Sequence, residues 1–368
     1  MIIKKFSASN FRNIESCNIE FTDGLNLLYG KNAQGKTNAL EGIYIFSRGR
    51  SFRAREDADL IRFGADGFHI AIDYTDVQGD ARLEYSLFGK ERQRKRNGYK
   101  LRSVTEMLGS FRSVLFYPDN LEIVKGGPEE RRSFLNIAIS QCYPAYIKYY
   151  ADYKRALENR NCLFRFMQKG LYVEENELAA WSQSLAELAA HVYIMRREYL
   201  DMLAPHAERI AGDISGGSER MTLAYECDID PDTHSVDEAR EQYMRVLTEN
   251  TDRERAAGVS LYGVHRDDVK ICINGMDSRL FASQGQQRTL VLALKLGEGE
   301  VIRTLTGEYP VYLFDDVLSE LDEKRRSYVL SDVAGKQMII TSCESDEYEK
   351  YGANKIDVSG GVYVPSHR

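Results

Sequence analysis

The first part of the chain alternates between apolar and polar positions in a way that predicts β-strands. Residues 2–11 alternate along their whole length, residues 17–21 form a second short run, and residues 25–29 form a third. The third run ends at a glycine, and a helical pattern follows it. The apolar stripe of that helix consists of Ala39, Leu40, Ile43 and Phe46. The chain is therefore predicted to begin with strands that lead into a strand–turn–helix unit.

Residues 68–104 continue the strand pattern, with Asn97-Gly98 as a typical hairpin turn. The middle of the chain that follows is predicted to be helical. Within residues 128–205, one helix carries tyrosines on one face and a later helix carries a heptad-like apolar seam over residues 178–202. A turn near Lys169-Gly170 would join them as an antiparallel hairpin. A plain helical core accounts for both stripes, so no ligand site is inferred there.

The last third of the chain returns to alternating helices and strands. Gly285 begins a helix that is apolar nearly all round, which predicts that this helix is buried. Residues 311–314 and 338–341 are short continuous apolar runs, which are typical of buried strands in a parallel sheet. The pattern as a whole predicts an α/β protein interrupted by a helical segment.

The composition excludes several classes of protein. The 368 residues suffice for two domains, and 43% hydrophobic residues is ordinary for a globular protein. No run approaches the roughly 18 apolar residues of a membrane span, and no signal-peptide segment follows the N-terminus. The six cysteines and six histidines lack the spacing of a zinc or catalytic metal site. A cytoplasmic protein with reduced thiols and no membrane partner is expected.

The sharpest chemical signal is a glycine-rich loop that fits the pattern G-x-x-x-x-G-K-[ST] between a predicted strand and a predicted helix. Its glycines let backbone N–H groups point inward around phosphates, and the helix N-terminus adds its positive end. Lys36 would place its charge on the outer phosphates of ATP, and Thr37 would offer its hydroxyl to Mg²⁺. The predicted nucleotide-binding set is Gly30, Lys31, Asn32, Ala33, Gln34, Gly35, Lys36, Thr37 and Asn38.

Two adjacent acids, Asp315 and Asp316, end the apolar run at residues 311–314. Magnesium prefers hard oxygen ligands, so a carboxylate at the tip of a buried strand beside the loop is the expected second anchor of the metal. Asp315 would hold Mg²⁺ together with Thr37. Asp316 would orient or deprotonate the attacking water, which makes Asp316 and Lys36 the predicted catalytic residues.

A third signal precedes the buried helix of the last third. Ser283-Gln284-Gly285-Gln286-Gln287 matches the S-x-G-Q core of the ABC signature motif, and residues 319–322 look like the D-loop that lines the same dimer interface. The Ser283 hydroxyl, the Gly285 N–H and the helix N-terminus would form a second anion cradle for the γ-phosphate, with Gln286 nearby. A serine three residues before a glutamine is also a good helix cap, and both roles can hold at once.

These motifs resemble the RecF family of ABC/SMC-type ATPases over nearly the whole chain. The resemblance implies a P-loop NTPase head of the ABC/SMC type, with a mixed sheet in lobe I and a helical arm as lobe II. The head would combine residues 1–115 and 255–368, and the arm would span residues 116–254. The matching blocks are residues 10–13, 30–32, 50–53, 125–128, 131–135, 265–268, 284–289 and 315–322.

The resemblance also implies a function. It implies an ATP-dependent homodimer that binds double-stranded and gapped DNA at duplex–single-strand junctions, works with RecO and RecR to load RecA, and hydrolyses ATP slowly. Arg12 would touch an ATP phosphate, as a basic residue does in related heads, although a surface arginine in a strand turn is the competing interpretation. The superfamily's switch histidine is replaced by Ser342-Cys343, and no Q-loop glutamine is located. The cluster at residues 265–268 is expected to brace the head.

Basic residues suggest where DNA would bind. Because the net charge is −7, such a surface must be local, or masked until another event exposes it. Phosphate contacts would give affinity without sequence preference, whereas a solvated strand edge is an equally good explanation of the hairpin. The hairpin carries Arg92, Arg94, Lys95, Arg96, Lys100 and Arg102, and the arm carries Lys148, Lys154, Arg155, Arg160, Arg165, Lys169, Arg196 and Arg197.

Two other functions share some of these motifs. An ABC-type ATPase subunit that energises a membrane transporter would have the same loop and signature, but it predicts a switch histidine and a compact helical lobe. A nuclease fused to an ABC head would need a further carboxylate-rich metal domain, and the sequence shows none after its last predicted strand.

Overall fold

The computed structural model describes residues 1–331 and 335–366. The chain forms two compact units, each assembled from separate stretches of sequence. Unit 1 comprises Met1–Leu121, Ile210–Gly217 and Arg288–Arg368, and unit 2 comprises Glu122–Arg209 and Ser218–Gln287. The sequence prediction assigned residues 255–287 to the head, whereas the structure groups them with the helices of unit 2.

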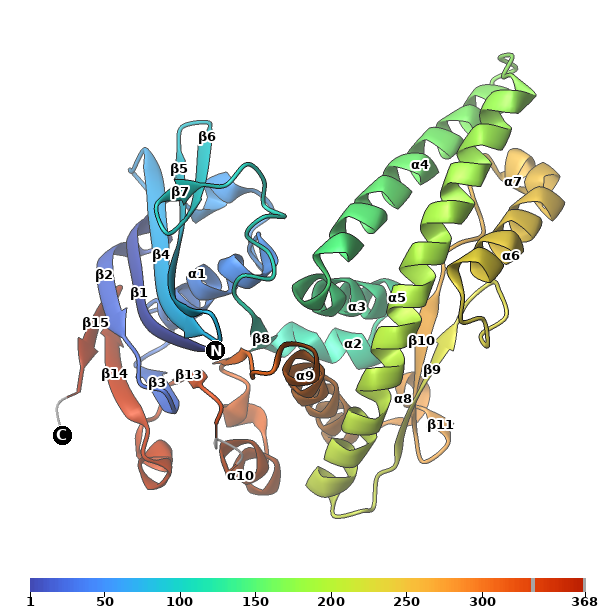
Figure 1. Ribbon diagram of the computed structural model, residues 1–368. Helices are drawn as coiled ribbons and strands as arrows, with labels where there is room; N and C mark the ends of the chain where they lie inside the picture. Colours follow the sequence, from blue (N-terminus) through green and yellow to red (C-terminus); the bar gives the residue numbers. More distant parts are fainter. Residues whose placement is uncertain (332–334, 367–368) are drawn as a thin grey trace. The chain divides into compact units, whose positions relative to one another are not determined.

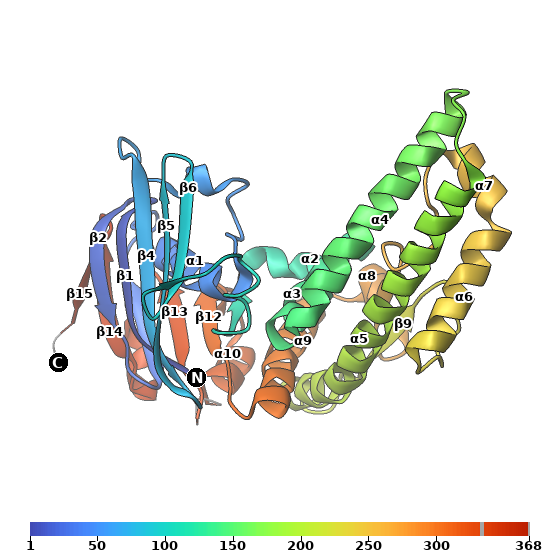
Figure 2. The same cartoon turned by 45° about the horizontal axis from the view of Figure 1, so that its top comes forward.

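Unit 1 contains an antiparallel sheet in which strands alternate buried and exposed positions, as the sequence pattern predicts. The strand order is β2-β1-β4-β5-β6-β7, and Figure 2 shows β2, β1, β4, β5 and β6 side by side. The hairpin turn at Asn97-Gly98 joins β6 to β7. The strands are β1 (Ile2–Phe11), β2 (Ile14–Glu20), β4 (Gly67–Asp76), β5 (Gly79–Phe88), β6 (Glu91–Arg96) and β7 (Tyr99–Lys100).

A second sheet of unit 1 is parallel except at one edge, in the order β15-β14-β3-β13-β12-β8. Parallel pairs join β14 to β3, β3 to β13, β13 to β12 and β12 to β8, and only β15 runs antiparallel to its neighbour. The carboxyl ends of β3, β12 and β13 therefore share one edge, where ligands of such sheets bind. The strands are β3 (Leu25–Tyr29), β8 (Ser113–Phe116), β12 (Val311–Asp315), β13 (Met338–Ser342), β14 (Asn354–Ser359) and β15 (Val362–Pro365).

Helix α1 (Lys36–Arg48) connects the two sheets of unit 1 through their core. It contacts β1 and β4 of the antiparallel sheet and β8, β12 and β13 of the other. Because both sides of α1 are covered, its residues from Ala39 to Ser47 are buried. The rest of unit 1 includes most of α9 (Gln284–Thr306), α10 (Glu323–Ser331) and short 3₁₀ turns at Asp57–Leu60, Pro118–Leu121, Leu318–Glu320 and Asp346–Tyr351.

Unit 2 is mainly helical, with a small sheet in the order β11-β10-β9. Figure 1 shows α4 and α5 joined at one end as an antiparallel hairpin, with the turn beside Lys169-Gly170, which confirms the predicted hairpin. Helix α5 is longer than predicted, and its last residues belong to unit 1. The elements are α2 (Glu122–Lys125), α3 (Pro128–Cys142), α4 (Pro144–Gln168), α5 (Glu175–Ser215), β9 (Met221–Glu226), α6 (Val236–Glu249), α7 (Thr251–Ala257), β10 (Asp268–Ile273), β11 (Met276–Asp277) and α8 (Ser278–Phe281).

Candidate nucleotide site

The glycine-rich loop leads from β3 into α1, and its backbone geometry requires glycine at two positions. Gly30 has φ +152°, Gly35 has φ +114°, and Ala33 between them has φ +64°. A Cβ added to Gly30 would lie 2.3 Å from the carbonyl oxygen of Val358, and a Cβ on Gly35 would lie 2.8 Å from Oδ1 of Asn13. Positive φ values at these positions turn the chain sharply enough for α1 to begin at once.

Lys36 folds back over this loop. Its Nζ donates hydrogen bonds to the carbonyl oxygens of Gly30, at 2.6 Å, and Lys31, at 3.0 Å. The sulfur of Cys343 lies 3.8 Å from the same Nζ, and the Cys343 thiol donates to Oδ1 of Asn32 at 2.9 Å. An exposed thiol at the mouth of the loop thus occupies the place where the sequence lacks a switch histidine.

Thr37 and Asp315 meet across the ends of α1 and β12. Thr37 Oγ1 donates to Oδ1 of Asp315 at 2.7 Å, and Thr341 Oγ1 lies 3.0 Å from the same oxygen. Thr341 is the residue of β13 that pairs with Asp315 in the parallel ladder, so the sheet register itself places this hydroxyl. Burial raises the pKa of Asp315, and the two hydroxyl hydrogen bonds partly offset that rise. A cation beside this buried carboxyl would favour its charged form.

Asp316 leaves the sheet in a left-handed conformation, with φ +57°. Its N–H donates to Oγ1 of Thr341 at 2.9 Å, and its carbonyl oxygen accepts from the hydroxyl of Ser319 at 2.8 Å. These two bonds hold the backbone on either side of the Asp316 side chain. The acid is therefore fixed at the edge of the sheet beside Asp315.

Arg12 is engaged by a buried carboxylate. Its Nε and Nη2 donate to Glu41 of α1, and its Nη1 donates to the carbonyl oxygen of Asp59 at 2.9 Å. Arg53 also donates from Nη2 to Glu41 and to Oδ1 of Asn38, the residue that follows Thr37. Burial raises the pKa of Asp315, and the charge of Arg53 is among the smaller influences that oppose this rise, so Arg53 belongs to the electrostatic environment of the site. The block at residues 50–53 was the only sequence signal for Arg53.

The turn that resembles the signature motif is a reciprocal helix cap. The N–H of Ser283 donates to Oε1 of Gln286 at 2.9 Å, and the N–H of Gln286 donates to Oγ of Ser283 at 3.3 Å. This confirms the predicted capping arrangement at the start of α9. Ser283 is exposed, and it belongs to unit 2, whereas the glycine-rich loop belongs to unit 1.

Two of the arginines predicted to face DNA are buried, so that prediction was wrong for them. Arg160 pairs with Glu254 at 2.7 Å, and Arg196 lies 3.7 Å from Asp267; both arginine side chains are 0% exposed. An arginine that is buried beside a carboxylate of the same chain cannot reach a DNA phosphate. The helical period indicates the burial of Arg196, because this residue lies on the same face of α5 as the buried Val192 and Tyr199.

The cluster at residues 265–268 forms hydrogen bonds that join several elements of unit 2. Asp267 accepts a hydrogen bond from the hydroxyl of Tyr225 at 2.5 Å, and Asp268 accepts a bidentate pair from Arg131 of α3. Burial raises the pKa of Asp267 to about 6. These contacts connect α3 and β9 to the start of β10 within unit 2.

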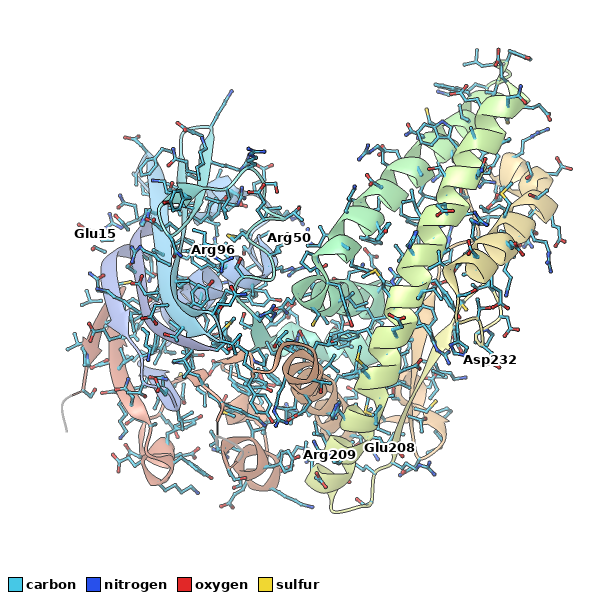
Figure 3. The ribbon with its side chains drawn as sticks, in the orientation of Figure 1. Glu15, Arg50, Arg96, Glu208, Arg209 and Asp232 are labelled. Atoms are coloured by element: carbon cyan, nitrogen blue, oxygen red, sulfur yellow. The ribbon has the colours of Figure 1, made fainter. Side chains whose placement is uncertain are left out.

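Another ion pair of unit 2 lies on α5. Glu208, which Figure 3 labels, pairs with Arg220 at 3.0 Å.

Within residues 1–331 and 335–366, no group of three or more His, Cys, Asp or Glu side chains could hold a metal ion. A magnesium ion bound with a nucleotide needs only one or two protein ligands, because phosphates and water supply the others. The helices of the same described part of the chain include none that is long and apolar enough to cross a bilayer.

Comparison with known proteins decides the family. The family described as the RecF/RecN/SMC N terminal domain matches residues 2–360. The DNA replication and repair protein RecF of Clostridioides difficile strain 630 is 37% identical over 346 residues, which cover 94% of this chain and 92% of that protein. The chain belongs to the RecF family. RecF of Thermoanaerobacter pseudethanolicus is 38% identical over 365 residues, 99% of each protein.

Solved structures agree with this membership of the RecF family. The RecF-ATPrS structure of the recombination mediator protein in the RecFOR pathway has a TM-score of 0.93 and 34% identity, and it covers 100% of this chain and 98% of that one. An Smc head domain of Pyrococcus furiosus has a TM-score of 0.58 at 16% identity, which shows a shared fold alone. The predicted ABC/SMC head fold is therefore confirmed. As a RecF protein the chain is an ABC/SMC-type ATPase, and the transporter interpretation is set aside.

Proposed function

We propose that this chain binds ATP and Mg²⁺ at the glycine-rich loop and uses the hydrolysis of ATP to ADP and phosphate as a conformational switch. The observation that carries the proposal is that Lys36 folds back over the loop while its neighbour Thr37 donates a hydrogen bond to Asp315 at 2.7 Å. Lys36 would exchange its carbonyl partners for phosphate oxygens, which form stronger charge-assisted bonds. The RecF-ATP structure supports this assignment, because that RecF protein was solved with ATP and this chain covers 97% of it.

Thr37 and Asp315 would hold Mg²⁺, which supplies positive charge to the phosphates when bound. Their oxygens are hard ligands, and Thr37 would turn its hydroxyl from Asp315 toward the ion. Asp316 would orient or deprotonate the attacking water, since it directly follows β12 and its backbone is fixed on both sides. Asn38 and Arg12 would complete the nucleotide site.

A second copy of the chain would complete each site. We propose that Ser283, Gly285 and Gln286 of one copy cap the nucleotide held by the loop of the other. The Ser283 oxygen accepts from the N–H of Gln286, which leaves the hydroxyl hydrogen able to donate to a phosphate. Helix α9 is 23 residues long and directs its N-terminal dipole at the same turn. ATP would therefore act as a bridge between two copies.

DNA would bind along the hairpin formed by β6 and β7. Lys95 and Lys100 are direct cross-strand partners, an arrangement that costs stability unless an anion lies between them. Other basic residues of the hairpin are already engaged: Arg92 pairs with Asp57, and Arg94 stacks on Tyr85. The exposed cations on the arm are Lys148, Arg165 and Lys169, together with Lys154, which lies over the Tyr150 ring, and Arg155, which pairs with Asp152.

In this proposal, ATP closes the homodimer, the closed dimer binds duplex DNA at gaps and duplex–single-strand junctions, and slow DNA-stimulated hydrolysis releases it. RecO and RecR would be its partners, with RecA loaded indirectly. The RecFOR pathway to which the matched RecF structures belong supports this choice of partners.

The test of the ATP switch combines sedimentation with a gel shift. The chain is sedimented with ATP, with ADP or without nucleotide, and duplex DNA with a single-stranded gap is titrated at one fixed salt concentration. The proposal expects a dimer only with ATP and tighter DNA binding in the same sample. Equal mass and equal DNA affinity in all three conditions would count decisively against it.

The hairpin is tested by the salt dependence of DNA binding. Replacing Lys95 and Lys100 together by glutamine should make the slope of log affinity against log salt shallower by about 1.8, or about 0.9 per phosphate. The matched control replaces Lys4 and Lys270, two half-exposed lysines on β1 and β10, by glutamine. A slope that changes equally in both double variants would assign the effect to net charge rather than to the hairpin.

A further inference from the structure

The turn between β14 and β15 holds the glycine-rich loop by hydrogen bonds to Gln34. The two strands form an antiparallel pair, and β14 lies next to β3, the strand that leads into the loop (Figure 1). The N–H of Gly361 donates to the main-chain oxygen of Gln34 at 2.8 Å, and the N–H of Gly360 donates to Oε1 of Gln34 at 2.6 Å. Residue 34 is therefore held through both its main chain and its side chain. The loop and the β14–β15 hairpin both belong to unit 1.

Tyr363 of β15 reaches the next residue of the loop. Its hydroxyl donates to the carbonyl oxygen of Gly35 at 2.8 Å. Tyr363 is only 9% exposed, and burial raises its pKa, so the hydroxyl keeps its hydrogen and remains a donor. The same oxygen accepts from the N–H of Asn38 at 2.9 Å, in the first turn of α1. Tyr363 thus adds a bond from β15 at the point where the loop becomes a helix.

These bonds determine which way two main-chain donors of the loop point. In a planar trans peptide the C=O and the following N–H point in opposite directions. Because the carbonyl of Gln34 faces the N–H of Gly361, the N–H of Gly35 points away from the hairpin. Because the carbonyl of Gly35 faces Tyr363 and α1, the N–H of Lys36 points away from both. Successive N–H groups directed to one side of a loop form a concave site for phosphate oxygens.

We infer that Tyr363 is a positioning residue for the nucleotide, which holds the peptide between Gly35 and Lys36 in its phosphate-binding orientation before ATP arrives. Tyr363 acts through the Gly35 carbonyl oxygen and need not touch ATP. A loop whose peptide orientation is already fixed loses less conformational freedom on binding, so its affinity for phosphates is higher.

This inference rests on the proposed binding of ATP at the loop and deepens it. It adds that the β14–β15 hairpin sets the affinity for ATP, although Tyr363 lies 328 positions after Gly35 in the sequence. A hydroxyl that served the fold alone would change the melting temperature and leave the affinity of the folded protein unchanged. Binding and stability measured on the same sample therefore separate the two roles.

The experiment titrates the full chain with ATP and with inorganic tripolyphosphate in a calorimeter and records a thermal melt of each sample. Tyr363→Phe removes the hydroxyl and keeps the ring. The affinity for ATP should fall about fivefold, which is the effect of losing one neutral hydrogen bond. Tripolyphosphate should lose affinity by the same factor, because it shares the phosphates of ATP and lacks the base and the sugar.

Steady-state hydrolysis supplies a second readout. In Tyr363→Phe the KM for ATP should rise by the same factor of about five, while kcat changes by less than about twofold. Loss of binding that the ground state and the transition state share has this pattern. A variant that lost kcat with an unchanged KM would contradict a role confined to the phosphate-binding loop.

The control is Tyr309→Phe, which removes another tyrosine hydroxyl of unit 1. The Tyr309 hydroxyl donates to Glu300 at 3.2 Å, and Tyr309 precedes β12, so it lies at the amino end of the parallel sheet, opposite the loop. Affinity for both ligands should change by less than about twofold in this variant.

A second variant keeps the test decisive if Tyr363→Phe fails to fold. Gln34→Met removes the acceptor of the Gly360 N–H and should weaken the binding of both ligands in the same direction. Wild-type affinity in a folded Tyr363→Phe or Gln34→Met chain, or a loss for ATP without a loss for tripolyphosphate, overturns the inference alone. A wild-type chain that binds neither ligand overturns the proposed function as well.

Discussion

Arg12 directs its Nε and Nη2 at the two carboxylate oxygens of Glu41, at distances of 2.9 and 2.8 Å. The Glu41 side chain is 0% exposed, and Arg53 and Ser51 also donate to it. Burial alone would raise the pKa of Glu41, but the hydrogen bonds and charges of these neighbours lower it below its usual value. A carboxylate on α1 therefore holds together residues 12 and 53, which are far apart in the sequence. Contact of Arg12 with ATP stays a prediction.

Replacing Glu41 by glutamine should destabilise the protein at neutral pH by about 2 kcal/mol, because two arginines lose their charged acceptor. A lowered folded-state pKa means that the stabilisation is present above the unfolded pKa of about 4.5 and is lost as the pH falls through the folded value. The difference between wild type and variant in urea unfolding should therefore be largest at pH 7 and shrink below about pH 4.5.

The control for this prediction is Glu15→Gln, which also removes a carboxylate that pairs with an arginine in unit 1. The Glu15 side chain, labelled in Figure 3, belongs to β2 and is 77% exposed in its pair with Arg62. Its loss should change the unfolding free energy by less than about 0.5 kcal/mol. A Glu41→Gln variant as stable as this control at pH 7 would show that the buried carboxylate is not a structural anchor.

Replacing Lys36 by alanine should abolish ATP binding while leaving the fold intact. The Lys36 ammonium bonds only to loop carbonyls and the Cys343 thiol in the described structure, so its loss should cost less than about 1 kcal/mol of stability. Calorimetric titration with ATP and a thermal melt of the same sample separate the two effects. ATP affinity close to that of wild type would remove Lys36 from the site.

Asp316→Asn should slow hydrolysis by at least about a hundredfold, because the base is lost, and should leave an ATP-bound dimer that persists. Asparagine tolerates the left-handed backbone of Asp316 nearly as well as aspartate does, so the fold at this position should be preserved. Single-turnover hydrolysis and sedimentation over hours provide the measurements. A variant that hydrolyses ATP at the wild-type rate would exclude Asp316 as the catalytic acid or base.

Features that are local in sequence could be predicted, because spacing alone determines them. The loop from Gly30 to Thr37, the acids Asp315 and Asp316 and the cap between Ser283 and Gln286 each depend on residues a few positions apart. The period of the apolar residues similarly indicated the hairpin of α4 and α5. These features needed no knowledge of how distant strands pair.

Features that depend on sheet order could not be predicted from one sequence. The hydroxyl of Thr341 reaches Asp315 because β13 pairs with β12, and Cys343 reaches Lys36 because β13 also pairs with β3. Likewise, Arg160 was expected on the surface because it is charged, yet a glutamate from α7 neutralises it in the interior. Partners almost a hundred residues apart carry no local signal.

Ser283→Arg should block the ATP-dependent dimer while sparing ATP binding by the monomer. The larger cationic side chain would fill the space that a phosphate of the other copy must enter, and the exposed turn should accommodate it without unfolding. Ser283→Ala, which loses the hydroxyl but adds no bulk, should weaken the dimer less. ATP-induced dimers of the arginine variant in sedimentation would contradict the capping role of this turn.

His265 should make the stability of the protein depend on pH between about 4 and 6.5. Its Nε2 lies 3.2 Å from the carbonyl oxygen of Ser260, so Nε2 carries the hydrogen, and Nδ1 accepts from the hydroxyl of Tyr153 at 2.7 Å. A neutral ring suits both bonds, and burial lowers the pKa of His265 to about 4. A His pKa below its unfolded value means that stability is fully present above the unfolded pKa and is lost as the pH falls toward the folded one.

The comparison that isolates this effect is wild type against His265→Gln, in which residue 265 no longer titrates. Between pH 7 and pH 5 the wild type should lose on the order of 2 kcal/mol of unfolding free energy relative to the variant. Asp267 has the opposite effect on the pH dependence of stability. Burial raises its pKa to about 6, so the free-energy cost of ionising it in the folded state grows as the pH rises. Because Asp267 is present in both proteins, its contribution largely cancels in the difference. Parallel curves of unfolding free energy against pH would mean that His265 binds the same number of protons in the folded and unfolded states, so its pKa would not be lowered by folding.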